Sequence, residues 1–319
     1  MRILLLSAKW LGDAVNTTGA VAAIQDAHPG AEIVVSVGAP GAGVFHGWPG
    51  IEVWERPKKL GLREQAAHFG RIRSRGFDLA VHLEVSRSLT RWVRLAGIPR
   101  RIGVAKTDDG HGLHAATQPS PDEHEVRGPI PRILDLLGLP AHEPDLRLTA
   151  AEVRAGQERR SQLDERPVIA MHLGASNMRK QWDLGQAADL IWHLESLGKQ
   201  SVLIGGPGDT TLIPDAPCAA WAGTMSVREM TAFLACAEGF VGNDSGPMHI
   251  AGALGLPTVG LFGPTNPARY SPPGQRSVTL RRCDCPFLAQ DSNDDCDGRC
   301  TRAIPWRDVA DALTTVLER

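Results

Sequence analysis

Residues 241–265 read VGNDSGPMHIAGALGLPTVGLFGPT, and this stretch decides the fold. An apolar run ends in Gly242-Asn243-Asp244, a serine, a glycine and a proline open a helix, and a second apolar run follows at 257–263. A strand, a helix and a strand in that order are typical of a parallel βαβ unit. Ligands of such sheets bind outside the carboxyl ends of the strands. The polar residues that end the first run therefore mark a candidate binding turn.

The same alternation of short apolar runs and helical patterns recurs along the whole chain of 319 residues. It predicts strands at 3–6, 32–37, 77–83, 100–104, 167–173, 200–206, 239–244 and 257–263. We expect an α/β protein of two Rossmann-like domains whose parallel sheets face a central cleft. The polar stretch 149–167 suggests a boundary, with domains at 1–155 and 156–319. We expect the final helix, begun by Pro305, to pack back on the N-terminal domain.

Charge and composition exclude several classes of protein. The formal net charge is −2, with no basic stripe of the kind that nucleic-acid binders carry. The chain has neither a G-x-G-x-x-G dinucleotide fingerprint nor a Walker A sequence. No apolar run is long enough to span a bilayer, and Lys9 and Asp13 interrupt the apolar N-terminus, so we expect no signal peptide. We expect a cytoplasmic protein, with association at the inner membrane surface left open by the Trp- and Arg-rich residues 91–101.

Asp13 follows the first predicted strand and lies where a helix opens. An aspartate in this position serves equally well as a helix N-cap or as a general base beside a bound ligand. The residues alone leave both interpretations open.

Further candidate ligand-binding residues follow later strands. Ser176, Asn177 and Lys180 precede a helix whose N-terminus favours an anion such as pyrophosphate, although a solvated loop fits as well. Asp209 ends a glycine-rich turn and could accept from a ribose hydroxyl, with a simple turn as the alternative. Met225 precedes a helix, where it packs either against a flat base or into the core.

The opening stretch supplies the remaining candidates. The backbone amides of Ser245 and Gly246 would point at a phosphate at a helix N-terminus, because glycine lets a ligand approach closely. Asp244 could hold sugar hydroxyls. His249 lies one helical turn further on and would face the same space.

These segments together resemble glycosyltransferase family 9, the bacterial heptosyltransferases. The resemblance covers nearly the whole chain and is carried by LGDAVNTTGAVAAI (11–24), HLGASNMRKQW (172–182), LIGGPGD (203–209) and VGNDSGPMHIAGALGLPTVGLFGPTNPARYSP (241–272). It implies a GT-B fold, with the acceptor on the N-terminal domain and the nucleotide sugar on the C-terminal one. It also implies inverting, metal-independent transfer of a heptose from ADP-L-glycero-D-manno-heptose.

The resemblance also implies roles for individual residues. Asp13 matches the family's catalytic base and Lys180 its phosphate-binding lysine. Met225 looks like the residue beside adenine, and Asp209 like the ribose contact. The donor-binding turn is matched by Asp244, Ser245, Gly246 and His249.

The acceptor stays open between a lipopolysaccharide core, another glycan or lipid-linked acceptor, a protein and a small secondary metabolite. Residues 56–76 are rich in arginine and lysine, which suits a phosphorylated sugar, although a solvated helix face explains the pattern at least as well. A nucleotide-sugar epimerase of the same fold and a non-catalytic sugar-nucleotide-binding protein are the alternatives to a transferase.

Four of the six cysteines are clustered near the C-terminus, at Cys283, Cys285, Cys296 and Cys300. Clustered cysteines in a cytoplasmic chain favour a metal over disulfides, and four thiolates suit a structural zinc or iron. Cys218 and Cys236 lie apart and read as ordinary buried thiols. Catalysis itself should need no metal cofactor, and the D-x-D sequence at 295–297 is discounted because it falls inside the cysteine cluster.

Overall fold

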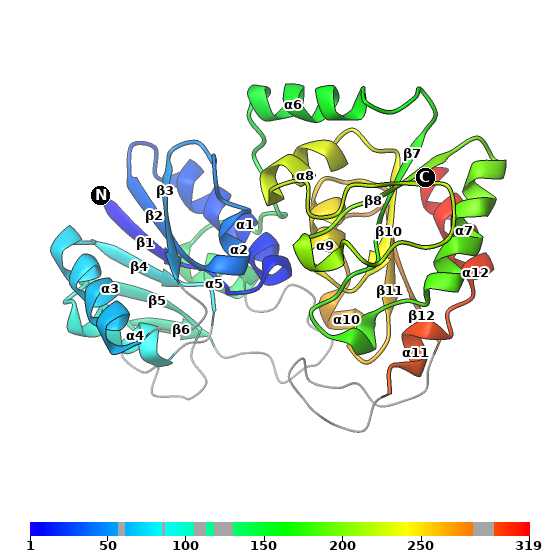
Figure 1. Ribbon diagram of the computed structural model, residues 1–319. Helices are drawn as coiled ribbons and strands as arrows, with labels where there is room; N and C mark the ends of the chain where they lie inside the picture. The colour runs from blue at the N-terminus through cyan, green and yellow to red at the C-terminus, as the bar shows by residue number, and fades with distance from the viewer. Residues whose placement is uncertain (57–60, 85–86, 105–112, 118–129, 283–296) are drawn as a thin grey trace. The chain divides into compact units, whose positions relative to one another are not determined.

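A computed structural model describes residues 1–56, 61–84, 87–104, 113–117, 130–282 and 297–319 (Figure 1). Contacts within the chain divide it into two compact units, Met1–Arg147 and Leu148–Arg319. The sequence places the boundary after residue 155, which lies within α6 (Ala150–Arg160). The second unit includes α6 because that helix packs against α8 (Val227–Leu234).

The first unit is built on a parallel sheet with strand order β3-β2-β1-β4-β5-β6 among the described residues. Its strands are β1 (Arg2–Leu6), β2 (Glu32–Gly38), β3 (Ile51–Arg56), β4 (Leu79–His82), β5 (Arg100–Val104) and β6 (Ala115–Thr117). Its helices are α1 (Leu11–Ala27), α2 (Ala39–Ala42), α3 (Leu62–Arg75), α4 (Arg87–Leu95) and α5 (Ile130–Leu137). The strands predicted at 3–6, 32–37, 77–83 and 100–104 are confirmed.

One core of this unit lies between the sheet and the helices α3 and α4. Leu4 and Val34 from the sheet, Ile72 from α3 and Val93 from α4 belong to the same buried cluster, together with Trp54 of β3. The Trp54 indole meets its need for a partner by donating from Nε1 to Glu52 Oε1 at 2.6 Å. The segment 56–76 is therefore not wholly a solvated face, because it supplies part of this core.

The second unit repeats the plan with strand order β12-β11-β10-β7-β8-β9, again all parallel. Its strands are β7 (Val168–His172), β8 (Gln200–Leu203), β9 (Cys218–Ala220), β10 (Gly239–Asn243), β11 (Thr258–Phe262) and β12 (Ser277–Arg281). Besides α6 and α8, its helices are η2 (Met178–Lys180), α7 (Leu184–Ser196), η3 (Pro207–Asp209), α9 (Gly246–Ala253), α10 (Pro267–Tyr270), α11 (Arg299–Arg302) and α12 (Trp306–Leu317).

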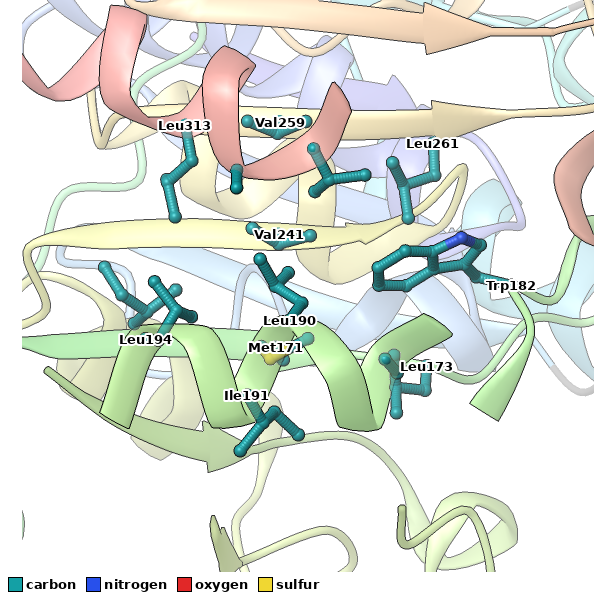
Figure 2. Packing of buried hydrophobic residues seen from close by; sticks show 14 of the residues in the cluster. Met171, Leu173, Trp182, Leu190, Ile191, Leu194, Val241, Val259, Leu261 and Leu313 are labelled. Carbon is teal, nitrogen blue, oxygen red and sulfur yellow. The ribbon is translucent and has the colours of Figure 1, made fainter. Parts of the chain in front are cut away.

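The main core of the second unit is closed by α7 and α12 on one face of the sheet (Figure 2). Met171, Val241 and Val259 from three neighbouring strands face Leu190 of α7 and Leu313 of α12. All five side chains are buried. Truncating one of them to alanine should cost about 2–5 kcal/mol of stability, as large-to-small changes in packed cores do.

Local signals in the sequence set the ends of these helices. Asp183 caps α7 by accepting from the amide of Gln186 at 3.0 Å, and Gly198 follows the helix with φ +72°. Ser226 and Glu229 form the predicted capping box of α8. These caps set the residues at which α7 and α8 begin and at which α7 ends.

Candidate functional site

The carboxyl ends of β7, β8 and β10 bring polar residues from distant parts of the chain to one edge of the second sheet. β7 pairs with both β8 and β10, so all three strands end side by side. His172 ends β7, Asp209 follows β8 in η3, and Asp244 and Ser245 follow β10. The sequence-predicted residues Lys180, Asp209, Asp244 and Ser245 therefore meet at this edge.

Lys180 and Asp244 form a buried ion pair. Nζ of Lys180 lies 2.7 Å from Oδ2 of Asp244, and the two residues are only 6% and 5% exposed. Thr265 Oγ1 donates to the same carboxylate oxygen at 2.6 Å. Thr265 was given no role from the sequence, although it ends the GPT turn after the strand that neighbours β10. Such a pair is stable only where its remaining hydrogen-bonding capacity is met.

Asn243 fixes the segment that carries Lys180. Its Oδ1 accepts from the amide of Trp182 at 3.0 Å, and its Nδ2 donates to the carbonyls of Leu173 and Gly174 at 2.7 and 3.2 Å. The Trp182 indole donates in turn to the carbonyl of Ile304 at 2.9 Å. The buried Asn243 side chain thus anchors both ends of the loop between β7 and α7, a role that its position in the sequence did not reveal.

A second polar group links Asp209, His172 and Ser245. Nε2 of His172 lies 3.2 Å from Oδ2 of Asp209, and Nδ1 lies 2.8 Å from Oγ of Ser245. The hydrogen bond from His172 is the main cause that lowers the pKa of Asp209, so this carboxyl is ionised at neutral pH. His172 was not predicted from the sequence; the signal for it was its place as the last residue of a buried strand.

His249 lies on α9, within the turn that follows Gly246. The side chain is buried, and its Nδ1 has no hydrogen-bond partner within the described part of the chain. Burial lowers the pKa of His249, with the charge on Asp244 acting in the opposite direction. A buried neutral imidazole with one open nitrogen is suited to a ligand that supplies the missing hydrogen bond.

Three further residues, Asn177, Ser176 and Met225, were predicted to bind the nucleotide-sugar donor. Asn177 caps η2, since its Oδ1 accepts from the amide of Arg179 at 3.0 Å, while Ser176 is exposed on the same loop. Met225 is half-buried beside Ser226, the N-cap of α8. Their roles toward a ligand stay predictions.

A cavity of about 230 Å³ adjoins Asp209. Its walls are mainly apolar and come from the ends of β7, β8 and β9 and from η3 and the residues after it, with Leu173, Leu203, Ile204, Leu212 and Ala220 among the lining residues. An apolar cavity with one carboxylate in its wall has the composition expected of a small-molecule site.

Asp13 is not the N-cap of its helix. Trp10 is the N-cap of α1, and Asp13 lies in the first turn of the helix, half-buried at the carboxyl end of β1. The structure thereby removes one of the two interpretations that the sequence left open for this carboxylate.

Near Asp13 lies an ion pair between the buried Arg56 and the half-buried Glu84. Arg56 donates to the carbonyls of Ser36 and Ser7 at 2.8 and 2.7 Å and to the Glu84 carboxylate. Burial raises the pKa of Glu84, Arg56 opposes that shift, and the charge on Asp13 adds to it. Arg56 ends β3 and is only 6% exposed, so it is wrong to count it with the solvated basic residues of 56–76. Lys58 and Lys59 of that segment lie outside the described residues.

The predicted cysteine cluster falls mostly outside the described residues, which include only Cys300. Cys300 is buried on α11 and is disulfide-bonded. Cys218 and Cys236 are free and half-buried, and burial raises the pKa of both thiols. Within the described ranges, no group of three or more His, Cys, Asp or Glu residues could hold a metal ion. Among those residues there is also no helix with the length and apolar character needed to cross a membrane.

Two Rossmann-like domains with parallel sheets, the second with a polar cluster at the carboxyl ends of its strands, are the architecture of the GT-B fold. A family model described as glycosyltransferase family 9 (heptosyltransferase) matches residues 65–294, more than half of the chain. The chain belongs to this family and is a glycosyltransferase.

Individual relatives agree with this assignment. The chain is 27% identical over 309 residues to lipopolysaccharide heptosyltransferase 2 of Escherichia coli K12, with 88% of each chain covered. The solved structure of E. coli ADP-heptose lps heptosyltransferase II matches with a TM-score of 0.78 at 23% identity, covering 100% of this chain and 99% of that one. The glycosyltransferase family 9 structure from Veillonella parvula gives 0.82 at 19% identity, covering 99% and 97%.

Proposed function

We propose that this protein transfers a heptose from ADP-L-glycero-D-manno-heptose to a hydroxyl of a lipopolysaccharide core acceptor, with inversion at the anomeric carbon. The observation that carries the proposal is the buried Lys180–Asp244 pair beside the His172–Asp209–Ser245 group, in a chain of this family. The names of its relatives, lipopolysaccharide heptosyltransferase 2 and ADP-heptose lps heptosyltransferase II, support the donor and the kind of acceptor.

Lys180 is held in place to receive the diphosphate of the donor. An ammonium group has three donors, and Asp244 takes one of them at 2.7 Å. The others can reach phosphate oxygens without breaking the ion pair. A lysine fixed in this way loses less side-chain entropy on binding than a freely moving one.

Asp244 has a second carboxylate oxygen with which it can bind the donor sugar. Lys180 and Thr265 both donate to Oδ2, so Oδ1 is the oxygen that can accept from hydroxyls of the donor sugar. His249 provides an imidazole nitrogen in the same turn. Ser245 and Gly246, at the start of α9, would bind phosphate oxygens through their amides.

Asp209 and the adjacent cavity are suited to the nucleoside. The ionised carboxylate accepts from ribose hydroxyls, and the apolar walls cover a purine ring. Met225 lies at the turn before α8 and is proposed to pack against the base, with Ser176 and Asn177 on the phosphate side.

Asp13 is the proposed general base. Its carboxylate accepts the proton from the acceptor hydroxyl while that oxygen forms a bond to the anomeric carbon. The bond from the anomeric carbon to the diphosphate oxygen breaks on the opposite side, and its electron pair leaves with ADP. A single displacement of this kind inverts the configuration. Lys180 and the α9 amides stabilise the charge that develops on the leaving diphosphate, which is the role that a metal ion has in other transferases.

The four-cysteine cluster is proposed as a structural element rather than part of the chemistry. A solved relative of this fold, TibC of enterotoxigenic E. coli, is described as an iron-containing glycosyltransferase; it has a TM-score of 0.59 and 16% identity, covering 99% of this chain and 76% of that one. Metal analysis of the purified protein and of Cys283→Ser and Cys300→Ser tests the proposal, with a thiol titration to count disulfide-bonded cysteines. Cys300 is disulfide-bonded in the structure, so metal-free protein with oxidised cysteines would make the structural element a disulfide, whereas variants that keep their fold but lose transfer would contradict the proposal.

Incubation of the full chain with ADP-heptose, a UDP-sugar and a GDP-sugar tests the donor assignment. We expect acceptor-dependent release of ADP, with little release of UDP or GDP. Release from the UDP- or GDP-sugar alone would overturn the heptose assignment. Binding of ADP-heptose without transfer to any lipopolysaccharide core acceptor would overturn the acceptor assignment.

A further inference from the structure

His172 lies between two side chains that come from the ends of other strands. Its imidazole reaches Asp209 Oδ2 at 3.2 Å from Nε2 and Ser245 Oγ at 2.8 Å from Nδ1. The histidine side chain is 6% exposed, so these two residues and not water determine its surroundings. None of the roles assigned above uses this histidine.

The three residues have little freedom to move apart. His172 is paired in the sheet with Gly242 of β10, which fixes its distance from the turn that begins at Asp244. The Asp209 carboxylate lies against two glycines: a Cβ at Gly174 would come within 1.9 Å of Oδ1, and a Cβ at Gly205 within 2.5 Å of Oδ2. Only residues without a side chain leave room for Asp209 in this position.

Each hydrogen bond among His172, Asp209 and Ser245 needs one donor and one acceptor. An ionised carboxylate only accepts, so Asp209 Oδ2 takes the amide proton of Gly206 at 2.8 Å and a proton on Nε2 of the ring. A neutral ring with its proton on Nε2 must accept at Nδ1, and the donor there is the Ser245 hydroxyl. That hydroxyl has one proton, which is then not available to a ligand.

The other tautomer reverses this arrangement. With its proton on Nδ1, the ring donates to Ser245 Oγ, and the hydroxyl proton turns outward. In the absence of a ligand it can reach the carbonyl of Asn243, which lies 3.0 Å from Oγ. In this change of tautomer one proton leaves Nε2 and one is taken up at Nδ1, so the number of protons on the ring is the same in both tautomers.

We propose that His172 is a positioning residue that couples Asp209 to Ser245, so that the nucleoside and the diphosphate of one ligand are bound cooperatively. The inference rests on the proposed function, in which Asp209 takes ribose hydroxyls and Ser245 contacts the diphosphate. Ribose hydroxyls that donate to Asp209 compete with Nε2 for Oδ2 and favour the proton on Nδ1. The Ser245 hydroxyl is then free to donate to a phosphate oxygen. The site thereby selects nucleoside diphosphates over ligands that offer only one of the two halves.

Pyrophosphate binding tests the coupling because this ligand has no ribose to touch Asp209. Calorimetry measures its Kd in the wild type, Asp209→Asn, His172→Ala and the double variant. Asparagine holds the Nε2 proton less strongly, so Asp209→Asn should tighten pyrophosphate binding. The gain should be at least about threefold larger when His172 is present than in the His172→Ala background, since contacting residues of one network do not act additively. The charge lost from Asp209 acts alike in both backgrounds and cancels in the comparison.

His172→Asn provides a further background for the same cycle. Its amide occupies the place of Nδ1 and keeps a contact with Ser245, but it has no atom in the place of Nε2. We expect pyrophosphate affinity closer to that of the wild type than His172→Ala shows, yet an equally small response to Asp209→Asn. Equal responses in all three backgrounds would overturn the coupling while leaving the donor site intact. A wild-type protein that binds neither ADP nor pyrophosphate would instead overturn the proposed function.

Discussion

The Nζ of Lys180 lies 2.7 Å from a carboxylate oxygen of Asp244, and both side chains are buried. The two residues are far apart in the sequence and meet because β7 and β10 are neighbours in the sheet. Removing water from two charges is costly, so the pair persists only with the support of Thr265 and of the loop that Asn243 anchors. The ion pair and these supports therefore hold the Lys180 and Asp244 side chains in fixed positions.

Lys180→Ala should destabilise the second domain as well as weaken ligand binding. The change leaves the Asp244 carboxylate buried without its cation, and breaking a buried pair costs about 3–5 kcal/mol. Hydrogen exchange of the β7 and β10 amides, followed by mass spectrometry, measures the loss within that domain.

Lys199→Ala is the matched control for this measurement. It removes the same charge from the same domain at a half-buried lysine outside the ion pair, and should change exchange of these amides little. Equal effects of the two substitutions would show that the Lys180–Asp244 pair does not stabilise the domain.

Gly174→Ala should weaken donor binding while the domain stays folded. The new methyl group would meet Asp209 Oδ1 at 1.9 Å and displace the carboxylate from His172. Loss of a hydrogen bond to a charged group predicts a rise of about tenfold or more in the KM for the donor. In the control Gly208→Ala, the added methyl meets nothing within 4 Å. An unchanged KM in Gly174→Ala would show that Asp209 does not take part in donor binding.

Low pH should destabilise the first domain because of His82. Burial lowers the pKa of this histidine from 6.5 to about 3, and neither ring nitrogen has a partner among the described residues. Below pH 6.5, His82 binds a proton in the unfolded chain but not in the folded one. The free energy of unfolding is therefore highest above pH 6.5 and falls as the pH drops toward 3. At pH 5 the loss is about 2 kcal/mol, and His68, with a pKa lowered to about 4, adds to it in the same direction.

His82→Leu tests the origin of this pH dependence, because leucine fills a similar volume without titrating. Exchange of the β1 and β4 amides at pH 7 and pH 5 gives the change in opening free energy. We expect the difference between the two pH values to shrink by about 2 kcal/mol in the variant. A difference as large as in the wild type would assign the acid sensitivity to other groups.

Much of the fold was readable from the sequence because its signals are local. The buried strands are continuous apolar runs, and Asp183, Ser226 and Gly198 mark helix ends by their own chemistry. The strands β3, β6, β9 and β12 were not predicted. They lie toward the edges of their sheets and are less uniformly buried than the central ones, so their apolar signal is weaker.

The site was only partly predictable, for a different physical reason. Asp13, Lys180, Asp209 and Asp244 stand in turns after strands, where parallel sheets bind ligands. Glu84, Thr265 and His172 act through partners that are distant in the sequence, and a partner of that kind leaves no local signal. Arg56 was misread because its neighbours are basic, whereas its burial follows from the Ser7, Ser36 and Glu84 groups around it.

Acceptor-dependent ADP release from ADP-heptose by the wild type and by Asp13→Asn tests the central claim most directly. Asparagine keeps the shape of the side chain but cannot take the acceptor proton, and loss of a general base slows a reaction by about 10² to 10⁴. We predict release by the wild type, a loss of that size in the variant and an unchanged Kd for ADP. Turnover by Asp13→Asn at the wild-type rate, or no release from ADP-heptose by the wild type, would contradict the account.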